Sequence, residues 1–266
     1  MMDLLLKNKS LSSEVMGDVE NIVSIILSSP IAPYIDTNTI RQNVATLNVK
    51  EANNTLEPIV YNSRENVINV DANKIDEFDS KFLLTKTLLG LMSNKSKEKL
   101  SGLTKVNGLK AIDEGIRDNI AESLVGNESE ISMYDDEKII VRLLGEIYGE
   151  DVLLESFFDN NPEMLLDKMN VRHYGPIIDN QLMLDIHDNY YHRFENNKSL
   201  LGEIQMQLID LMLAKQNVTD EQINEFAEHL CVGSRLFGDK QEMYASVEQV
   251  YPYLYEQLKL KKGKQL

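Results

Sequence analysis

The sequence predicts an α+β protein that is predominantly α-helical, with a small β element followed by a C-terminal helical region. Apolar residues recur at helical spacing along most of the chain. The clearest strand-like alternation lies between Pro58 and Val70. The 266 residues are 42% hydrophobic, and glycine and proline are sparse, so we expect a folded globular chain rather than extended disorder.

The first predicted elements are two amphipathic helices. The segment from Ser13 to Ser28 carries valine and isoleucine on one stripe, and Pro30 ends it. The segment from Thr37 to Leu47 also places its apolar residues on one side. A short strand is expected within Asn48 to Asn54, before the stronger β signal begins.

The strongest β signal predicts a hairpin or strand pair. Ile59 and Tyr61 alternate with other residues in the first half, and Val67 to Val70 forms the second. The five residues between these halves, 62–66, are polar and typical of a turn. Asp76 to Ser93 is then rich in leucine and phenylalanine and predicts a helix.

The segment from Asn94 to Gly108 is polar and lysine-rich, which predicts an exposed loop. After it the pattern is helical almost throughout. A weak break near Arg172 to Asp179 suggests a zincin-like α+β domain at 1–171 and a helical region at 172–266. The remaining predicted helices are Leu109 up to a stop at Gly126, Asp135–Tyr148, Val152–Phe158, Pro162–Met169, Leu182–Phe194, Ser199–Lys215, Thr219–Cys231 and Lys240–Leu258.

Charge and cysteine content restrict the surroundings and partners. The formal net charge of -16 disfavours binding to nucleic-acid phosphates. Cys231 is the only cysteine, so no intramolecular disulfide can form, which fits a reducing compartment. No segment approaches the ~20 apolar residues that cross a bilayer, and the start is too short for a signal-peptide core. We expect a cytoplasmic, bacterial protein without membrane or nucleic-acid partners.

The order of elements in the middle of the chain is distinctive. A strand with the sequence Asn66 to Val70 is followed by a helix containing Lys86 to Ser93. After a loop, a second helix opens with Asp113-Glu114-Gly115. From Leu56 to Asn161 this layout resembles the gluzincins, zincin metallopeptidases in which a strand, an HExxH helix and a glutamate-bearing helix follow one another. The resemblance implies a zincin-like core.

The HExxH helix binds Zn²⁺ through two histidines four residues apart, and its glutamate acts as general base. On this layout Lys86 and Gly90 stand at the histidine positions and Thr87 stands at the general base. Glu114 keeps the position of the third ligand, with Asp118 one turn further. The resemblance therefore implies a vestigial site with no catalytic residue, no metal and no cofactor. A Lys86–Glu114 ion pair is expected where the metal would lie.

Simpler interpretations of the same residues stay open. Lys86 is also compatible with a solvated position on its helix, and Glu114 with Asp118 is compatible with an exposed acidic face. Asp113 and Arg117 have the spacing of an ordinary i,i+4 pair. All four histidines lie in the last third of the chain, away from the candidate helix.

These interpretations lead to three hypotheses about function. The first is a catalytically inactive metallopeptidase-like scaffold that binds a protein or peptide, for example by adding an extended peptide beside the strand near Val67. The second is a helical adaptor or regulator without peptidase ancestry that uses its acidic surface. The third is a residual hydrolase without zinc, in which Glu114 acts as general base.

Overall fold

The computed structural model describes residues 13–74, 78–95, 100–127, 133–174, 177–192, 200–201, 203–204, 207–208 and 211. This part of the chain is predominantly helical with a small three-stranded sheet, so the predicted α+β class is confirmed at this level. Its elements are α2 (Ser13–Leu27), η1 (Ala32–Tyr34), α3 (Thr37–Ala45), β1 (Asn48–Glu51), β2 (Ile59–Asn62), β3 (Val67–Val70), α4 (Ser80–Met92), η3 (Asn107–Leu109), α5 (Lys110–Val125), α6 (Asp135–Tyr148), α7 (Glu150–Phe158), α8 (Pro162–Met169), β4 (Arg172–Tyr174), β5 (Ile177–Asp179) and α9 (Gln181–Tyr191).

The sheet has the strand order β1-β3-β2. β2 and β3 form the predicted antiparallel hairpin, and β1 pairs with β3 in parallel. The register aligns Ile68 with Val49 on one side and with Tyr61 on the other. Because β3 is paired along both edges, the expectation that a peptide adds beside the strand near Val67 is wrong.

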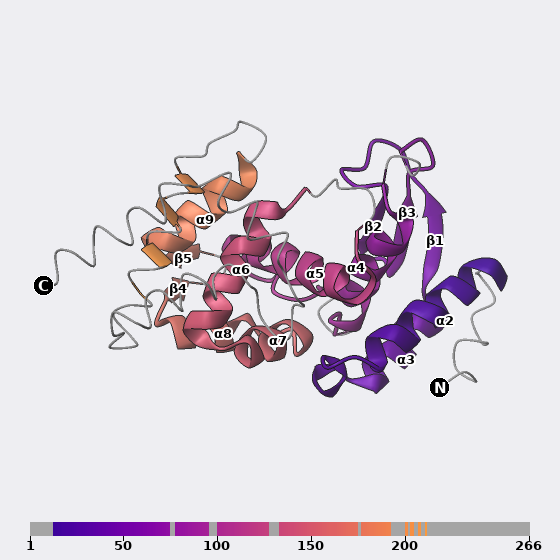
Figure 1. Cartoon of the computed structure of the whole chain (residues 1–266), viewed down its shortest axis with the longest axis horizontal. Coiled ribbons are helices and arrows are strands. Elements are labelled where there is room, and N and C mark those ends of the chain that lie inside the picture. The colour runs from indigo at the N-terminus through magenta and orange to yellow at the C-terminus, as the bar shows by residue number, and fades with distance from the viewer. Residues whose placement is uncertain are drawn as a thin grey trace, which may run out of the picture.

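Helix α5 lies in the middle of the molecule (Figure 1). It packs against α4, α6, α7 and α9, and α4 in turn packs against β2, α2 and α3. The three-stranded sheet therefore lies on one side of α5, and α9 with β4 and β5 lies on the other (Figure 1). One continuous apolar core joins these elements, and its largest fully buried side chains are Phe157, Phe158, Ile26, Ile31, Leu47, Ile68, Leu83, Leu88, Leu89, Leu91 and Met92.

Helix ends follow the local chemistry of the sequence. Asp36 and Asp79 cap α3 and α4 by accepting backbone N–H groups in the first turn. The Asp79 cap explains why α4 begins at Ser80, later than the predicted start at Asp76. Helices α6 and α8 have the predicted bounds, and α5 ends before Gly126, whose φ of 75° suits glycine.

One prediction about an irregular segment is wrong, and one short hairpin was not predicted. The segment from Asn94 to Gly108 is not an exposed loop throughout, because Leu103 and Val106 are buried in the core. The region Arg172 to Asp179 contains the antiparallel hairpin β4–β5, which the sequence pattern did not indicate. Its three-residue strands are too short to give a readable alternation.

The C-terminal helices predicted at Thr219–Cys231 and Lys240–Leu258 lie outside the described residues, as does most of Ser199–Lys215. The side chains of β4 and β5 are likewise described only at Arg172. Within the described ranges, none of the helices combines the length and apolar character that crossing a bilayer requires.

Helices α5 and α6 approach each other closely at Gly115. A Cβ atom at Gly115 would overlap the backbone carbonyl of Glu137 and crowd the Val141 side chain. The neighbouring Asn119 amide bridges the two helices by donating to the carbonyl oxygens of Gly115 (2.9 Å) and Lys138 (3.1 Å). The glycine of the Asp113-Glu114-Gly115 sequence therefore has a packing role of its own.

We predict that Gly115→Ala destabilises the protein by about 1–3 kcal/mol, because the added methyl group forces α5 and α6 apart. Gly17→Ala is the matched control, since Gly17 is an exposed position of α2 with nothing within 4 Å of a built Cβ. That substitution should stabilise by up to about 1 kcal/mol through helix propensity. Urea unfolding followed by circular dichroism measures both; equal effects of the two substitutions would contradict the packing role.

Candidate functional site

Lys86 lies at the middle of α4 and is almost completely buried, with 2% of its surface exposed. Its neighbours along the helix, Thr85, Thr87, Leu88 and Leu89, are buried as well. A buried lysine must be paired if it keeps its charge, because an isolated ammonium group in a protein interior is strongly destabilising. The interpretation of Lys86 as a solvated helix residue is wrong.

Three carboxylates from two other segments surround the Lys86 ammonium group. Lys86 Nζ donates a hydrogen bond to Glu57 Oε1 at 2.8 Å. It also forms ion pairs with Asp118 Oδ1 at 2.6 Å and Glu114 Oε2 at 3.4 Å. The ring of Tyr134 covers the same nitrogen at 3.7 Å from its centroid, a cation–π contact. The predicted Lys86–Glu114 ion pair is therefore present, within a larger set.

Arg117 extends this set along α5. Its guanidinium bonds Asp113 Oδ2 through Nε (2.9 Å) and Nη2 (2.5 Å), and Nη2 also bonds Glu114 Oε1 at 2.8 Å. The predicted Asp113–Arg117 pair is thus confirmed. The second oxygen of Asp113 accepts the backbone N–H of Leu103 at 2.7 Å, which fixes the loop after α4 against α5. We call the whole group the Lys86 cluster: Lys86, Arg117, Glu57, Asp113, Glu114, Asp118 and the Tyr134 ring.

Burial and mutual attraction oppose each other in the Lys86 cluster. Burial lowers the pKa of Lys86, but Asp118, Glu57 and Glu114 outweigh it and raise the pKa above its ordinary value, so Lys86 stays charged. Burial raises the pKa of Asp118 and Glu57 despite the pairing with Lys86. For Glu114, Arg117 and Lys86 overcome burial and hold the pKa below its usual range.

Thr87 and Gly90 lie on the same helix but have different surroundings. Thr87 Oγ1 donates to the backbone carbonyl of Ile59 at 3.3 Å and so joins α4 to β2. At Gly90 a Cβ atom would meet Cδ1 of Tyr61 at 3.4 Å and Nη1 of Arg117 at 3.8 Å. A side chain larger than alanine at position 90 would therefore have to displace the Tyr61 ring or the Arg117 guanidinium.

The structure brings together Lys86, Glu114 and Asp118, which were singled out from the sequence, and it buries all three. The interpretation of Glu114 and Asp118 as an exposed acidic face is wrong, because they are 7% and 1% exposed. Sequence reasoning missed Glu57 and Tyr134. Neither has a spacing signal, since each reaches Lys86 only through tertiary packing of separate segments.

The histidines do not contribute to the Lys86 cluster within the described part of the chain. His187 lies on α9, where its ring contacts Tyr191, and His192 caps the end of the same helix. His229 and Cys231 lie outside the described residues, as does the His173 side chain. Among the described side chains, no group of three His, Cys, Asp or Glu residues is arranged to hold a metal ion.

The chemistry of the Lys86 cluster is that of a buried ionic crosslink. It joins the segment before β2 to α4 and α5, with two cations among four carboxyl groups. Comparison with known proteins found no matching family, no similar curated protein and no similar solved structure. The geometry of the cluster is therefore the main guide to function.

We predict that Lys86→Met destabilises the protein by about 3–5 kcal/mol at neutral pH, because it leaves Glu57, Glu114 and Asp118 without their shared cation. The control is Lys81→Met on the exposed surface of the same helix, with a change within about 0.5 kcal/mol. Urea unfolding curves provide the measurement.

The loss should also depend on pH. Removing Lys86 raises the folded-state pKa of Glu57 and Asp118 further above their unfolded values. The folded variant then binds protons more readily than the unfolded chain, so the deficit shrinks as the pH falls through the raised pKa values. A deficit that stays constant between neutral and mildly acidic buffers would show that the carboxylates do not depend on Lys86.

Proposed function

We propose that this chain is a catalytically inactive, metallopeptidase-like scaffold, built on the gluzincin plan, that binds a protein or peptide. The observation that carries the proposal is the position of the Lys86 ammonium group among Glu57, Glu114 and Asp118. On the gluzincin layout Lys86 replaces the first histidine and Glu114 keeps the third-ligand position. The ammonium group then supplies the positive charge that links the two helices in place of a metal ion.

The surroundings of α4 support this proposal. Gly90 stands at the second histidine position, and a Cβ atom there would contact the Tyr61 ring and the Arg117 guanidinium. Thr87 stands at the general-base position and donates its hydroxyl group to a backbone carbonyl. A charged lysine repels a divalent cation, and threonine cannot take a proton from water at neutral pH as a carboxylate can.

A hydrolase that uses Glu114 without zinc is less well supported. A general base must reach substrate and accept a proton. Glu114 is 7% exposed, is bonded to Arg117, and is paired with Lys86. These two cations hold its pKa below the ordinary value, which weakens it as a base. If hydrolytic activity is found and this alternative is correct, Glu114→Gln should abolish the activity. Unchanged activity in Glu114→Gln would exclude Glu114 as the general base.

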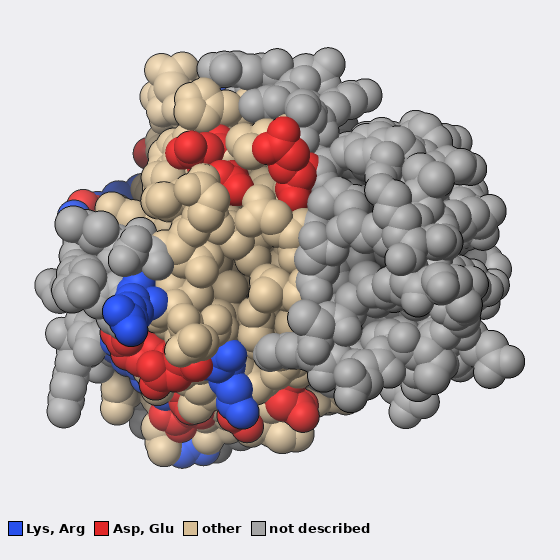
Figure 2. Space-filling view, turned by 90° about the vertical axis from the view of Figure 1, so that its left-hand side faces the viewer, with Lys and Arg blue, Asp and Glu red and all other residues tan. Residues whose placement is uncertain are grey.

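The alternative of an acidic adaptor without peptidase ancestry would use a broad acidic surface. On the side of the molecule in Figure 2, the described Asp and Glu side chains form separate groups with uncharged surface between them. Lys and Arg side chains lie beside the lower groups (Figure 2). This side therefore offers no continuous acidic face among its described residues, which favours the scaffold over the adaptor.

We predict that the purified chain, incubated with excess zinc and then desalted, retains zinc well below stoichiometry and cleaves no peptide in a quenched-fluorescence library. The physical reason is the repulsion between the Lys86 ammonium group and a divalent cation. Plasma mass spectrometry measures the metal. Stoichiometric zinc that is lost in Glu114→Gln, or zinc-dependent cleavage, would refute the proposal, because both require a working site at Glu114.

A further inference from the structure

The two edges of the three-stranded sheet differ in their cover. At β2 the carbonyl of Ile59 accepts the hydroxyl of Thr87, so α4 lies against that edge. At β1 the described part of the chain provides no strand beyond the parallel pair with β3. An uncovered edge presents backbone donors and acceptors that can pair with another extended segment. The outer edge of β1 is therefore the one at which a strand can be added.

The ladder between β1 and β3 identifies the outward-facing backbone groups. The N–H groups of Asn48 and Ala52 bond the carbonyls of Asn66 (3.2 Å) and Val70 (2.9 Å). Because alternate residues of a strand face opposite neighbours, the backbone groups of Val49 and Glu51 point away from β3. The Val49 N–H bonds the Asn48 side chain at 2.9 Å. The carbonyl groups of Val49 and Glu51 and the Glu51 N–H thus define the outer edge.

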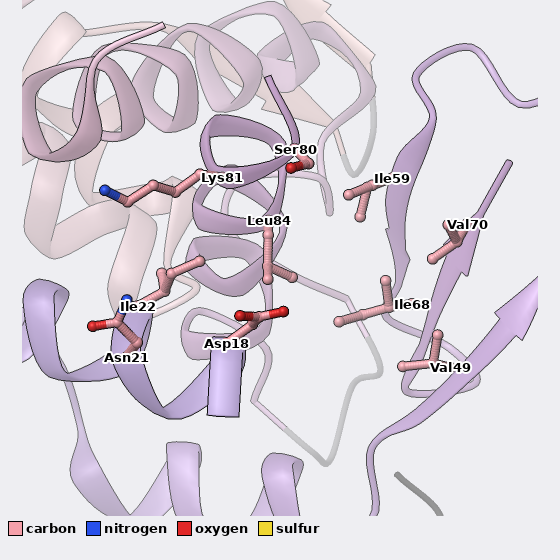
Figure 3. A pocket seen from close by; sticks show the side chains of 10 residues that line it. All are labelled: Asp18, Asn21, Ile22, Val49, Ile59, Ile68, Val70, Ser80, Lys81 and Leu84. Atoms are coloured by element: carbon pink, nitrogen blue, oxygen red, sulfur yellow. The ribbon is translucent and has the colours of Figure 1, made fainter. Parts of the chain in front are cut away.

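A groove of about 440 Å³ lies beside this edge, between the sheet, α2 and α4 (Figure 3). This volume is within the usual range of ligand pockets, about 300–1,000 Å³. Val49, Ile68, Val70 and Ile59 form the strand wall, and Ile22 with Leu84 adds apolar surface from the helices. A side chain from a strand added to β1 on the Val49 face would enter here.

The charged side chains that α2 and β1 direct to the groove side of the sheet are acidic. Asp18 lies on the α2 wall and is exposed, and Glu51 shares the Val49 face of β1. Lys81 also borders the groove but points away from the strands (Figure 3). Lys50 lies on the opposite face of β1, where it pairs with Glu65 at 3.4 Å. This side therefore complements a basic side chain next to an apolar one.

We propose that the outer edge of β1 and this groove bind an extended segment of a partner protein. The segment adds as a strand and places an apolar side chain in the groove opposite Val49. Two residues away it places Lys or Arg opposite Glu51, on the side of the sheet that faces α2 and Asp18. The spacing follows from strand geometry, in which every second side chain faces the same side. This inference rests on the proposed function, since it names the site and chemistry of the peptide that the scaffold binds.

The test uses fluorescence anisotropy with the labelled peptide Thr-Lys-Thr-Ile-Thr-Lys-Thr, whose symmetric pattern suits either strand direction. The acidic peptide Thr-Glu-Thr-Ile-Thr-Glu-Thr is the comparison. The intact chain should bind the basic peptide at least about fivefold more tightly than the acidic one, as expected from cross-strand charge pairs. Absence of binding, or equal binding of the two peptides, would overturn the proposal.

Two substitutions at one position separate backbone pairing from charge. Glu51→Pro removes an N–H that the ladder with β3 does not use, and should lower the affinity for the basic peptide about tenfold. Glu51→Lys keeps the N–H and reverses the charge. It should lower the affinity for the basic peptide about fivefold and raise the affinity for the acidic peptide. Glu146→Lys, an exposed position of α6, gives the same change in net charge and should leave binding unchanged.

Circular dichroism and urea midpoints establish that the three variants are folded. The proposed site would be overturned if Glu51→Pro bound the basic peptide with wild-type affinity, or if Glu146→Lys lost as much affinity as Glu51→Lys. The proposed function fails by other observations, namely stoichiometric zinc or cleavage of the probe peptide detected by mass spectrometry. Such results would leave the binding comparison at Glu51 intact, so the two failures are distinguishable.

Discussion

The buried ammonium group of Lys86 is the interaction on which the centre of the molecule depends. It connects α4 to Glu57 before β2 and to Glu114 and Asp118 on α5. These three segments are separated in sequence, and Lys86 pairs with a carboxylate from each of the other two. Burial makes the connection demanding, because each partner would be strongly destabilising alone. The segment before β2, α4 and α5 must therefore come together for all of these charges to be satisfied.

Buried polar groups along the rest of α5 must likewise be paired. Asp113 joins Arg117 to the loop after α4 through the Leu103 N–H. One turn beyond Gly115, Asn119 accepts from Arg142 Nε at 2.6 Å while donating to both helices. Helix α5 thus carries a row of buried polar groups that pair with Lys86, Arg117, Arg142 and the Leu103 backbone. Such networks specify one packing arrangement more strictly than apolar contacts do.

Sequence periodicity was sufficient for most helices in the described part of the chain, because their apolar stripes and caps are local. The expected Lys86–Glu114 pair came from the resemblance to the gluzincin layout and not from periodicity, and the structure contains this pair. Periodicity was insufficient for Glu57, for the buried segment around Leu103 and for the central position of β3. These features depend on which distant segments meet. Asp113 on α5 accepts the Leu103 N–H and so holds the segment around Leu103 against α5. β3 is central because β1, which precedes the hairpin in the sequence, pairs with the edge of β3 that β2 leaves open.

The stabilisation supplied by Lys86 differs from that of a bound metal ion in its dependence on concentration. An ion stabilises a fold by mass action, so its contribution changes with its free concentration and disappears when a chelator removes it. The Lys86 ammonium group is covalently part of the chain, and its local concentration beside Glu57, Glu114 and Asp118 is constant. The crosslink between α4 and α5 is therefore independent of dilution and of the supply of metal ions in the surrounding solution.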